Sequence, residues 1–213
     1  DNYSHSAAEA FRRLRTNIKL SSPGGLPSSI LVTGPNQGCG KSLIATNIAI
    51  SFSHILDSVL LVDTDLRRPS IESNLGISQK AGLTDILTGQ DETANIFKIN
   101  GVHVLPSGTL PPNPSELLDS QKMRELIKIW ENEYELIILD SPPILSVSDS
   151  VILANEVDST LMVAAYGETS RGMIEQSTEL MERLGIKTIG FVLNKVLLKR
   201  EYGYYSYHYH EYY

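Results

Sequence analysis

The sequence contains a single cysteine, Cys39, among 213 residues. One cysteine excludes a disulfide framework and a cysteine-based metal cluster, and it fits a reducing compartment. No run of about 18 apolar residues is present, so no membrane-spanning helix is predicted, and no signal peptide is recognisable. The net charge of −7 leaves no basic excess for nucleic acid. These absences favour an intracellular globular domain.

The chain is long enough for one α/β domain, and 41% of its residues are hydrophobic. Apolar runs typical of buried parallel strands alternate with segments of helical periodicity. This alternation predicts a parallel β-sheet with helices on both faces. Strands are expected near residues 30–33, 59–62, 102–105, 136–139, 160–165 and 187–193. Helices are expected at 1–21, from the glycine-rich loop to about 55, from 116 to about 131 with Ser115 as its cap, and at 170–184, with short helices and turns in 70–101.

The first of these strands runs into a glycine-rich segment, residues 34–42, and a helical pattern follows it. Strand, glycine loop, Lys41-Ser42 and helix are the parts of a phosphate-binding loop. Backbone N–H groups and the helix N-terminus would bind the phosphates, Lys41 would reach the outer phosphates, and Ser42 would ligate Mg²⁺. The strict Walker A pattern has glycine at the position of Pro35, so this is a deviant Walker A.

Three aspartates stand where predicted parallel strands end: Asp63, Asp65 and Asp140. Ligands of α/β sheets bind at the carboxyl ends of the strands, and carboxylates there can hold Mg²⁺. The alternative is that Asp63 and Asp65 only cap a turn. Asp149 fits either a switch segment or a helix cap, and His103 is interpreted as a structural histidine.

Residues 1–21 show the periodicity of an amphipathic helix whose polar face carries Glu9, Arg12 and Arg15. These charges form either a solvated face or a contact with another subunit, and their spacing alone favours the solvated face.

Seven of the ten tyrosines lie within residues 202–213. Without aliphatic residues this segment is predicted to be flexible. It is either a low-complexity tail or a set of phosphate acceptors, since each phosphate would add about −1.5 to −2 charges. His208 and His210 alone are a poor metal site. The candidate acceptors are Tyr202, Tyr204, Tyr205, Tyr207, Tyr209, Tyr212 and Tyr213.

Together these motifs resemble the catalytic domain of bacterial tyrosine kinases (BY-kinases), which serve exopolysaccharide and capsule export. Residues 36–42 resemble the family's Walker A, 59–69 its Walker A′ and 136–143 its Walker B. The Glu9, Arg12 and Arg15 spacing is similar to its oligomerisation motif, which reverses the interpretation of a solvated face. Residues 106–108, 111–116 and the terminal tyrosines also match. The resemblance divides the chain into a P-loop kinase domain at 1–201 and a tail at 202–213.

The resemblance implies ATP and Mg²⁺ as cofactors and assigns roles to the matching residues. Lys41 would hold the β- and γ-phosphates, and Ser42, Asp65 and Asp140 would support Mg²⁺. Asp63 is the candidate base for the tyrosine hydroxyl. How the roles of base and Mg²⁺ support are divided between Asp63 and Asp65 is left open. The nucleotide would further contact residues of the loop and of the last strand, namely Gly38, Cys39, Gly40, Leu43 and Asn194.

The resemblance also implies a homo-oligomeric ring, by likeness an octamer, in which one subunit's tail enters its neighbour's active site. The implied partners are a transmembrane polysaccharide co-polymerase, fused or separate, and a tyrosine phosphatase, but no nucleic acid. Because the chain starts at Asp1, it is expected to be a soluble cytoplasmic piece of a longer membrane protein. Three alternatives remain. A Min/Par-type assembly ATPase is disfavoured because Asn36 stands where those proteins have an extra lysine, and an iron–sulfur carrier is disfavoured by the single cysteine. The third alternative is a non-catalytic nucleotide-binding scaffold.

Overall fold

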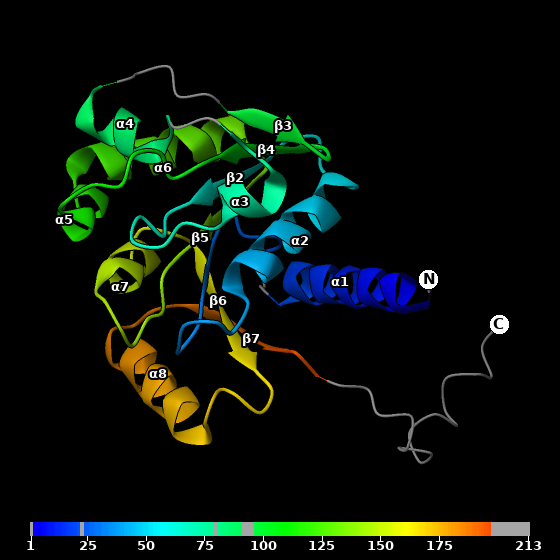
Figure 1. The fold of residues 1–213 in the computed structure, drawn as a ribbon. Coiled ribbons are helices and arrows are strands. Elements are labelled where there is room, and N and C mark those ends of the chain that lie inside the picture. Colours follow the sequence, from blue (N-terminus) through cyan, green and yellow to red (C-terminus); the bar gives the residue numbers. More distant parts are fainter. Residues whose placement is uncertain (1, 22–23, 79–80, 91–95, 197–213) are drawn as a thin grey trace, which may run out of the picture.

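The computed structural model describes residues 2–21, 24–78, 81–90 and 96–196, with side chains from residue 6 onward. A seven-stranded sheet in the order β3-β4-β2-β5-β1-β6-β7 forms its centre (Figure 1). The predicted α/β fold, a largely parallel sheet with helices on both faces, is confirmed. The strands are β1 Ser29–Thr33, β2 Val59–Asp63, β3 Phe97–Ile99, β4 Val102–Leu105, β5 Leu136–Asp140, β6 Ser159–Ala165 and β7 Thr188–Asn194.

The four central strands β2, β5, β1 and β6 are buried at every residue. Helices cover both faces of the sheet, which explains why these strands read as continuous apolar runs rather than as alternating patterns. Their pairings are all parallel, and Asp63 of β2 lies in register with Asp140 of β5. The carboxyl ends of β1, β2 and β5 therefore open at one edge, directly beside the glycine loop.

Strand β3 is the exception, because it pairs antiparallel with β4. Asn100 and Gly101 connect the two strands with φ angles of 50° and 83°, the left-handed conformation of a tight hairpin turn. The sequence had predicted only short helices and turns for this region. A partly exposed edge strand of three residues is too short to produce a recognisable alternation.

Helices α1, α2 and α3 contribute to the apolar cluster on one face of the sheet, and α4 to α8 contribute to the cluster on the other. Their arrangement can be followed in Figure 1. The described helices are α1 Asn2–Leu20, α2 Lys41–Ser53, α3 Ile71–Leu75, α4 Leu83–Thr88, α5 Pro114–Leu118, α6 Gln121–Glu133, α7 Asp149–Ala154 and α8 Arg171–Arg183. None of the helices in these ranges is long and apolar enough to cross a bilayer.

The helix predicted from 116 to about 131 is two helices, α5 and α6. The side chain of Ser120 accepts a hydrogen bond from the Met123 N–H at 3.2 Å and so starts α6 as its N-cap. The predicted cap, Ser115, lies inside α5 and donates instead to Asp149 Oδ1 at 2.6 Å. The expectation for Ser115 was wrong because a second capping serine follows five residues later and begins its own helix.

The amphipathic helix at the N-terminus is confirmed as α1, which packs on α2. Phe11, Leu14 and Ile18 face the core, and Ile18 is 1% exposed. Arg15 donates to the backbone carbonyl of Ser51 in α2. One face of α1 is therefore tied to the domain, while Arg12 on the other face stays exposed.

Candidate nucleotide-binding and phosphotransfer site

The loop between β1 and α2 has a backbone that requires glycine. Gly38 and Gly40 adopt φ angles of 81° and 94°, in the left-handed region that favours glycine. A Cβ at Gly34 would lie 2.4 Å from the Val163 carbonyl oxygen and 2.6 Å from Cys39 Sγ. Gly40 is the N-cap of α2, so Lys41 and Ser42 begin the helix. The loop thus directs the N-terminus of α2 toward the space beyond β1, as a phosphate site requires.

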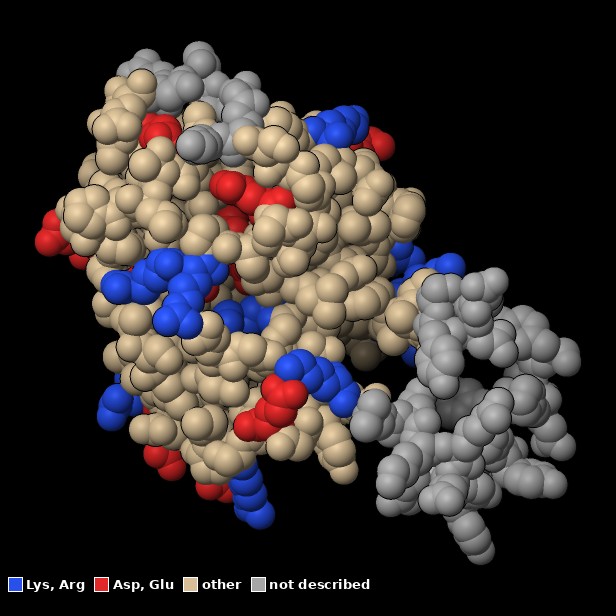
Figure 2. Space-filling view, in the orientation of Figure 1, with Lys and Arg blue, Asp and Glu red and all other residues tan. Residues whose placement is uncertain are grey.

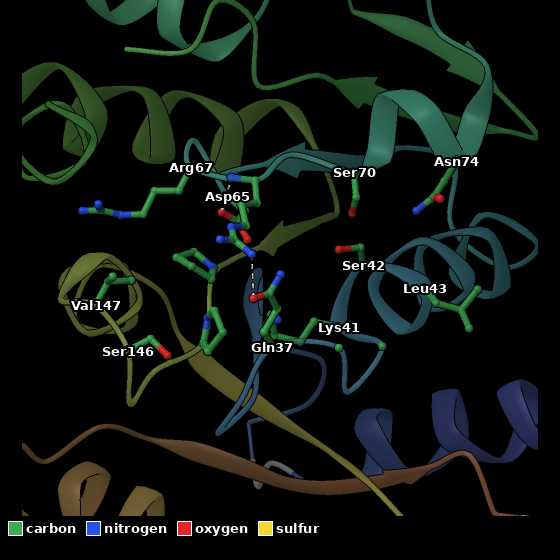
Figure 3. A pocket seen from close by; sticks show the side chains of 15 residues that line it. Gln37, Lys41, Ser42, Leu43, Asp65, Arg67, Ser70, Asn74, Ser146 and Val147 are labelled. Carbon is green, nitrogen blue, oxygen red and sulfur yellow. Dashed lines mark hydrogen bonds between the residues drawn. The ribbon is translucent and has the colours of Figure 1, made fainter. Parts of the chain in front are cut away.

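A cavity of about 500 Å³ lies over this loop (Figure 3). In the space-filling view, acidic and basic side chains face one another around a hollow in the same face (Figure 2). Six of the residues predicted from the sequence line the cavity, namely Gly38, Gly40, Lys41, Ser42, Leu43 and Asp65. The other lining residues are Gln37, Arg67, Arg68, Ser70, Asn74, Pro142, Pro143, Ser146 and Val147.

Asp63 and Asp140 lie beneath the cavity rather than in its lining. Asp63 is fully buried and accepts three backbone N–H groups, from Asp65, Ser70 and Ile71, each at 3.1 Å. Burial raises the pKa of Asp63 to about 7, against the opposing effect of these hydrogen bonds. Asp63 therefore holds the loop that follows β2, and its pKa is close to neutral pH.

The carboxylate of Asp140 is 1% exposed, and neither of its oxygens has a hydrogen-bond partner. Burial, followed by the negative charge of Asp63, raises the pKa of Asp140 well above its ordinary value, although the positive charge of Lys41 opposes this rise. A buried, unpartnered carboxylate near a helix-starting serine fits a bound cation. No three His, Cys, Asp or Glu side chains cluster as metal ligands in the described ranges. Mg²⁺ at nucleotide sites needs only one or two carboxylates, because phosphates and water complete its shell.

Asp65 is the carboxylate that reaches the cavity wall, and it is half-buried. Its Oδ1 accepts the backbone N–H of Arg68 at 3.0 Å. The two arginines that follow it also line the cavity, and sequence reasoning missed both. Their only signal was their place directly after two carboxylates at a strand end.

Cys39 and Asn194 were predicted to contact the nucleotide, but neither lines the cavity. Cys39 is fully buried, and burial raises the pKa of its thiol. Asn194, at the end of β7, donates from Nδ2 to the Cys39 carbonyl oxygen at 2.9 Å and accepts the Lys195 N–H at 2.8 Å. In this structure the Cys39 side chain is buried within the loop, and Asn194 stabilises the loop through the Cys39 carbonyl.

The remaining predicted residues lie apart from the cavity or outside the described ranges. Glu9 and Arg12 form an exposed ion pair at 2.9 Å on α1. His103 packs edge-on against the ring of Tyr134, with centroids 5.4 Å apart. Asp149 begins α7 and pairs with Arg67. The seven tyrosines predicted as phosphate acceptors in residues 202–213, and His208 and His210, lie outside the described residues.

Three similarities place this chain among known proteins. The profile of the ParA family, described as NUBPL iron-transfer P-loop NTPase, matches residues 26–203. Tyrosine-protein kinase Wzc of Salmonella typhi is 36% identical over 95% of the chain, which spans 29% of the length of that protein. Tyrosine-protein kinase YwqD of Bacillus subtilis is 34% identical over 93% of the chain and 86% of its own length.

A solved structure agrees with these relatives. The kinase domain of the Escherichia coli tyrosine kinase ETK superposes with a TM-score of 0.85 and 31% identity, covering 96% of this chain and 81% of that one. The glycine loop, the paired strand-end aspartates and these similarities lead to one conclusion. The chain belongs to the bacterial tyrosine-kinase family, on the fold of the ParA-like P-loop NTPases.

Proposed function

We propose that this chain is an ATP-dependent protein-tyrosine kinase that phosphorylates its own C-terminal tyrosine cluster. The cavity carries the proposal, because Lys41, Ser42 and Asp65 line one space above the buried carboxylates of Asp63 and Asp140. Phosphoryl transfer needs mainly positioning and charge neutralisation, and this arrangement supplies both.

The roles of these residues are assigned from the resemblance to the family. Lys41 would neutralise the β- and γ-phosphates, while Ser42 and Asp140 would hold Mg²⁺ with support from Asp65. Bound Mg²⁺ supplies further neutralisation of phosphate charge. The loop glycines Gly38 and Gly40 let backbone N–H groups approach the phosphates closely.

Transfer requires a base, because a free phenol has a pKa of about 10. The phenol oxygen bonds to the γ-phosphorus, the bond from that phosphorus to the bridging oxygen breaks, ADP leaves, and the phenol proton passes to a carboxylate. Asp63 and Asp65 remain the two candidates. The geometry favours Asp65 as the acceptor, since Asp65 lines the cavity while the Asp63 oxygens are occupied by three backbone N–H groups.

We further propose that transfer occurs between subunits of a homo-oligomeric ring, an octamer by resemblance. The exposure of Glu9 and Arg12 on α1 supports their role in a subunit contact, whereas Arg15 already binds α2. Phosphorylated tails, each phosphate adding about −1.5 to −2 charges, would repel one another and open the ring. The proposed setting is the cytoplasmic face of the membrane, with a polysaccharide co-polymerase as activator, a phosphatase as antagonist and control of exopolysaccharide or capsule export as output.

An assembly ATPase is the second candidate, and Asn36 argues against it. Asn36 stands where such ATPases carry an extra lysine, and its Oδ1 accepts a hydrogen bond from Thr169 Oγ1 at 2.8 Å. The residue thus has a structural partner within its own subunit. A non-catalytic scaffold would bind nucleotide through the same loop without modifying the tail.

The test is incubation of the full chain with Mg²⁺ and ATP, followed by mass mapping of residues 200–213. Lys41→Met, Asp63→Asn and Asp65→Asn are compared with Lys128→Met, which changes an exposed lysine on α6. We expect phosphate on several tail tyrosines of the wild type and of the Lys128 variant, and its loss in the Lys41 and Asp65 variants. ATP hydrolysis with an unmodified tail, even with the activator segment present, would favour the assembly ATPase, and nucleotide binding without either reaction would favour the scaffold.

A further inference from the structure

Two consecutive arginines, Arg67 and Arg68, line the nucleotide cavity, and their hydrogen bonds divide them into different roles. We propose that Arg68 is a γ-phosphate ligand that leaves Gln37 when ATP binds, whereas Arg67 is a structural anchor. This inference rests on the proposed nucleotide site and adds a residue that distinguishes ATP from ADP.

The guanidinium of Arg67 is committed to the protein itself. Its Nε donates to Asp149 Oδ2 at 2.8 Å, and its Nη2 donates to Asp149 Oδ1 at 3.1 Å and to Ser115 Oγ at 2.9 Å. The Asp149 side chain is fully buried. Removing Arg67 from this carboxylate would leave a buried charge without its partner, which is costly. Arg67 is therefore held in place between α5 and α7.

The guanidinium of Arg68 makes fewer hydrogen bonds than that of Arg67. It is exposed, and among the described residues its side chain donates one hydrogen bond, from Nη1 to the neutral Oε1 of Gln37 at 2.8 Å. No carboxylate of the described residues lies within ion-pair distance of it. The dashed line that ends on Gln37 in Figure 3 marks this bond between the segment after β2 and the glycine loop. Most of its donors thus remain available at the mouth of the cavity.

The backbone of Arg68 is fixed while its side chain is free to exchange partners. Its N–H is bonded to Asp65 Oδ1 at 3.0 Å, and Asp63 holds the N–H groups of Ser70 and Ile71 on the other side. A guanidinium anchored in this way changes its partner by side-chain rotation alone. Exchange of a neutral amide oxygen for a phosphate oxygen pairs the guanidinium with an opposite charge, and arginine–phosphate contacts are frequently bidentate, which strengthens the contact.

The γ-phosphate is the phosphate that this guanidinium would meet. Lys41 lies at the start of α2 and reaches the phosphates from that side, whereas Gln37 and Arg68 line the cavity from the early part of the loop and from the segment after β2. In phosphoryl transfer an arginine on the γ-phosphate oxygens also stabilises the charge of the transition state. Arg68 therefore favours ATP over ADP and promotes the transfer step.

The experiment measures the affinity of the full chain for Mg²⁺·AMP-PNP, a non-hydrolysable ATP analogue, and for Mg²⁺·ADP by titration calorimetry. Arg68→Ala should weaken AMP-PNP binding about tenfold, the value of one charge-assisted contact, and ADP binding by less than about threefold. Arg68→Lys should fall between, because lysine keeps the charge but loses the planar fork. Arg124→Ala is the control, since Arg124 pairs with Asp119 beside α6 and should leave both affinities unchanged.

Equal weakening of both nucleotides by Arg68→Ala, or no weakening of either, would overturn the inference. A thermal unfolding midpoint matching the wild type shows that the variant is folded, and Arg68→Lys provides the test if it is not. Tail phosphorylation is measured on the same samples. If Arg68→Ala weakens AMP-PNP binding selectively but the wild-type tail stays unmodified, the proposed kinase activity is refuted and the role of Arg68 is retained. If the wild-type tail is modified but the variant keeps the nucleotide preference of the wild type, the kinase activity is retained and the role of Arg68 is refuted.

Discussion

Replacing Asp140 with asparagine removes a charge that the fold holds unfavourably when Mg²⁺ is withheld. Asp140 is 1% exposed, its two oxygens have no hydrogen-bond partner, and Asp63 lies beside it in register on the neighbouring strand. Asparagine has nearly the same shape and carries no charge. We therefore expect Asp140→Asn to stabilise the Mg²⁺-free protein at alkaline pH.

The magnitude follows from the spacing of the strands. Neighbouring strands are about 4.8 Å apart, and two unit charges at that separation repel by about 3 kcal/mol at an effective dielectric constant of about 20. The free energy of unfolding at pH 8.5 should therefore rise by up to about 3 kcal/mol in the variant.

The pH dependence has a definite sign. Burial raises the pKa of both carboxyls, that of Asp63 to about 7. Such groups bind more protons in the folded than in the unfolded state, so stability falls as pH rises from the unfolded pKa through the folded one. The wild type should lose stability as the pH rises from about 4 to 8.5, and the variant should lose less. The two proteins should therefore converge at about pH 4 and below, where the carboxyl is protonated in both states.

The assay is urea unfolding in EDTA, followed by the fluorescence of Trp130, the one tryptophan of the chain, which is 4% exposed. Asp57→Asn is the control, because Asp57 is exposed and its exchange should change stability by less than about 0.5 kcal/mol. A variant at Asp140 that is no more stable than the wild type at pH 8.5, or that keeps the same pH dependence, would refute the reasoning.

Three further predictions concern the residues around the site. Asp149→Asn should lower the free energy of unfolding by about 2 kcal/mol at pH 7, since it leaves Arg67 without its charged partner. Arg67 holds the pKa of Asp149 below its ordinary value, so this loss should shrink below about pH 4 in urea titrations, and a constant difference would contradict it. Gly40→Ala should weaken nucleotide binding at least about tenfold, because a Cβ there would lie 2.2 Å from Asn194 Nδ2 at a φ of 94°, and unchanged affinity by calorimetry would refute this. Arg12→Ala should shift the chain toward monomer in sedimentation velocity while its unfolding changes by less than about 0.5 kcal/mol, and an unchanged oligomer would exclude the contact.

The sheet was predictable because its central strands are buried on both faces and therefore appear as uninterrupted apolar runs. The position of the phosphate loop was also predictable, since the left-handed backbone at Gly38 and Gly40 restricts the residue type there. Asp63 and Asp140 were expected at strand ends and lie there. Their depth below the cavity depends on packing from both faces, which no local pattern encodes.

The features that escaped prediction depend on contacts between distant segments. Arg67 meets Asp149 across 82 positions, and Arg68 meets Gln37 across 31. Such contacts leave no trace in periodicity or in spacing. The division between α5 and α6 was missed for a different reason. Ser115 and Ser120 are both residues that can cap a helix, and only the folded structure shows that Ser120 is the N-cap of α6.

The central claim is that the tyrosine-rich end of one chain is phosphorylated in the active site of another. The most direct measurement mixes the active full chain with a ¹⁵N-labelled Lys41→Met chain, adds Mg²⁺ and ATP with the activator segment, and maps the heavy peptides of residues 200–213. The account predicts phosphate on several tyrosines of the heavy, inactive chain. An active light chain whose own tail is modified while the heavy tail stays unmodified would contradict transfer between subunits, and no phosphate on either tail would contradict the kinase itself.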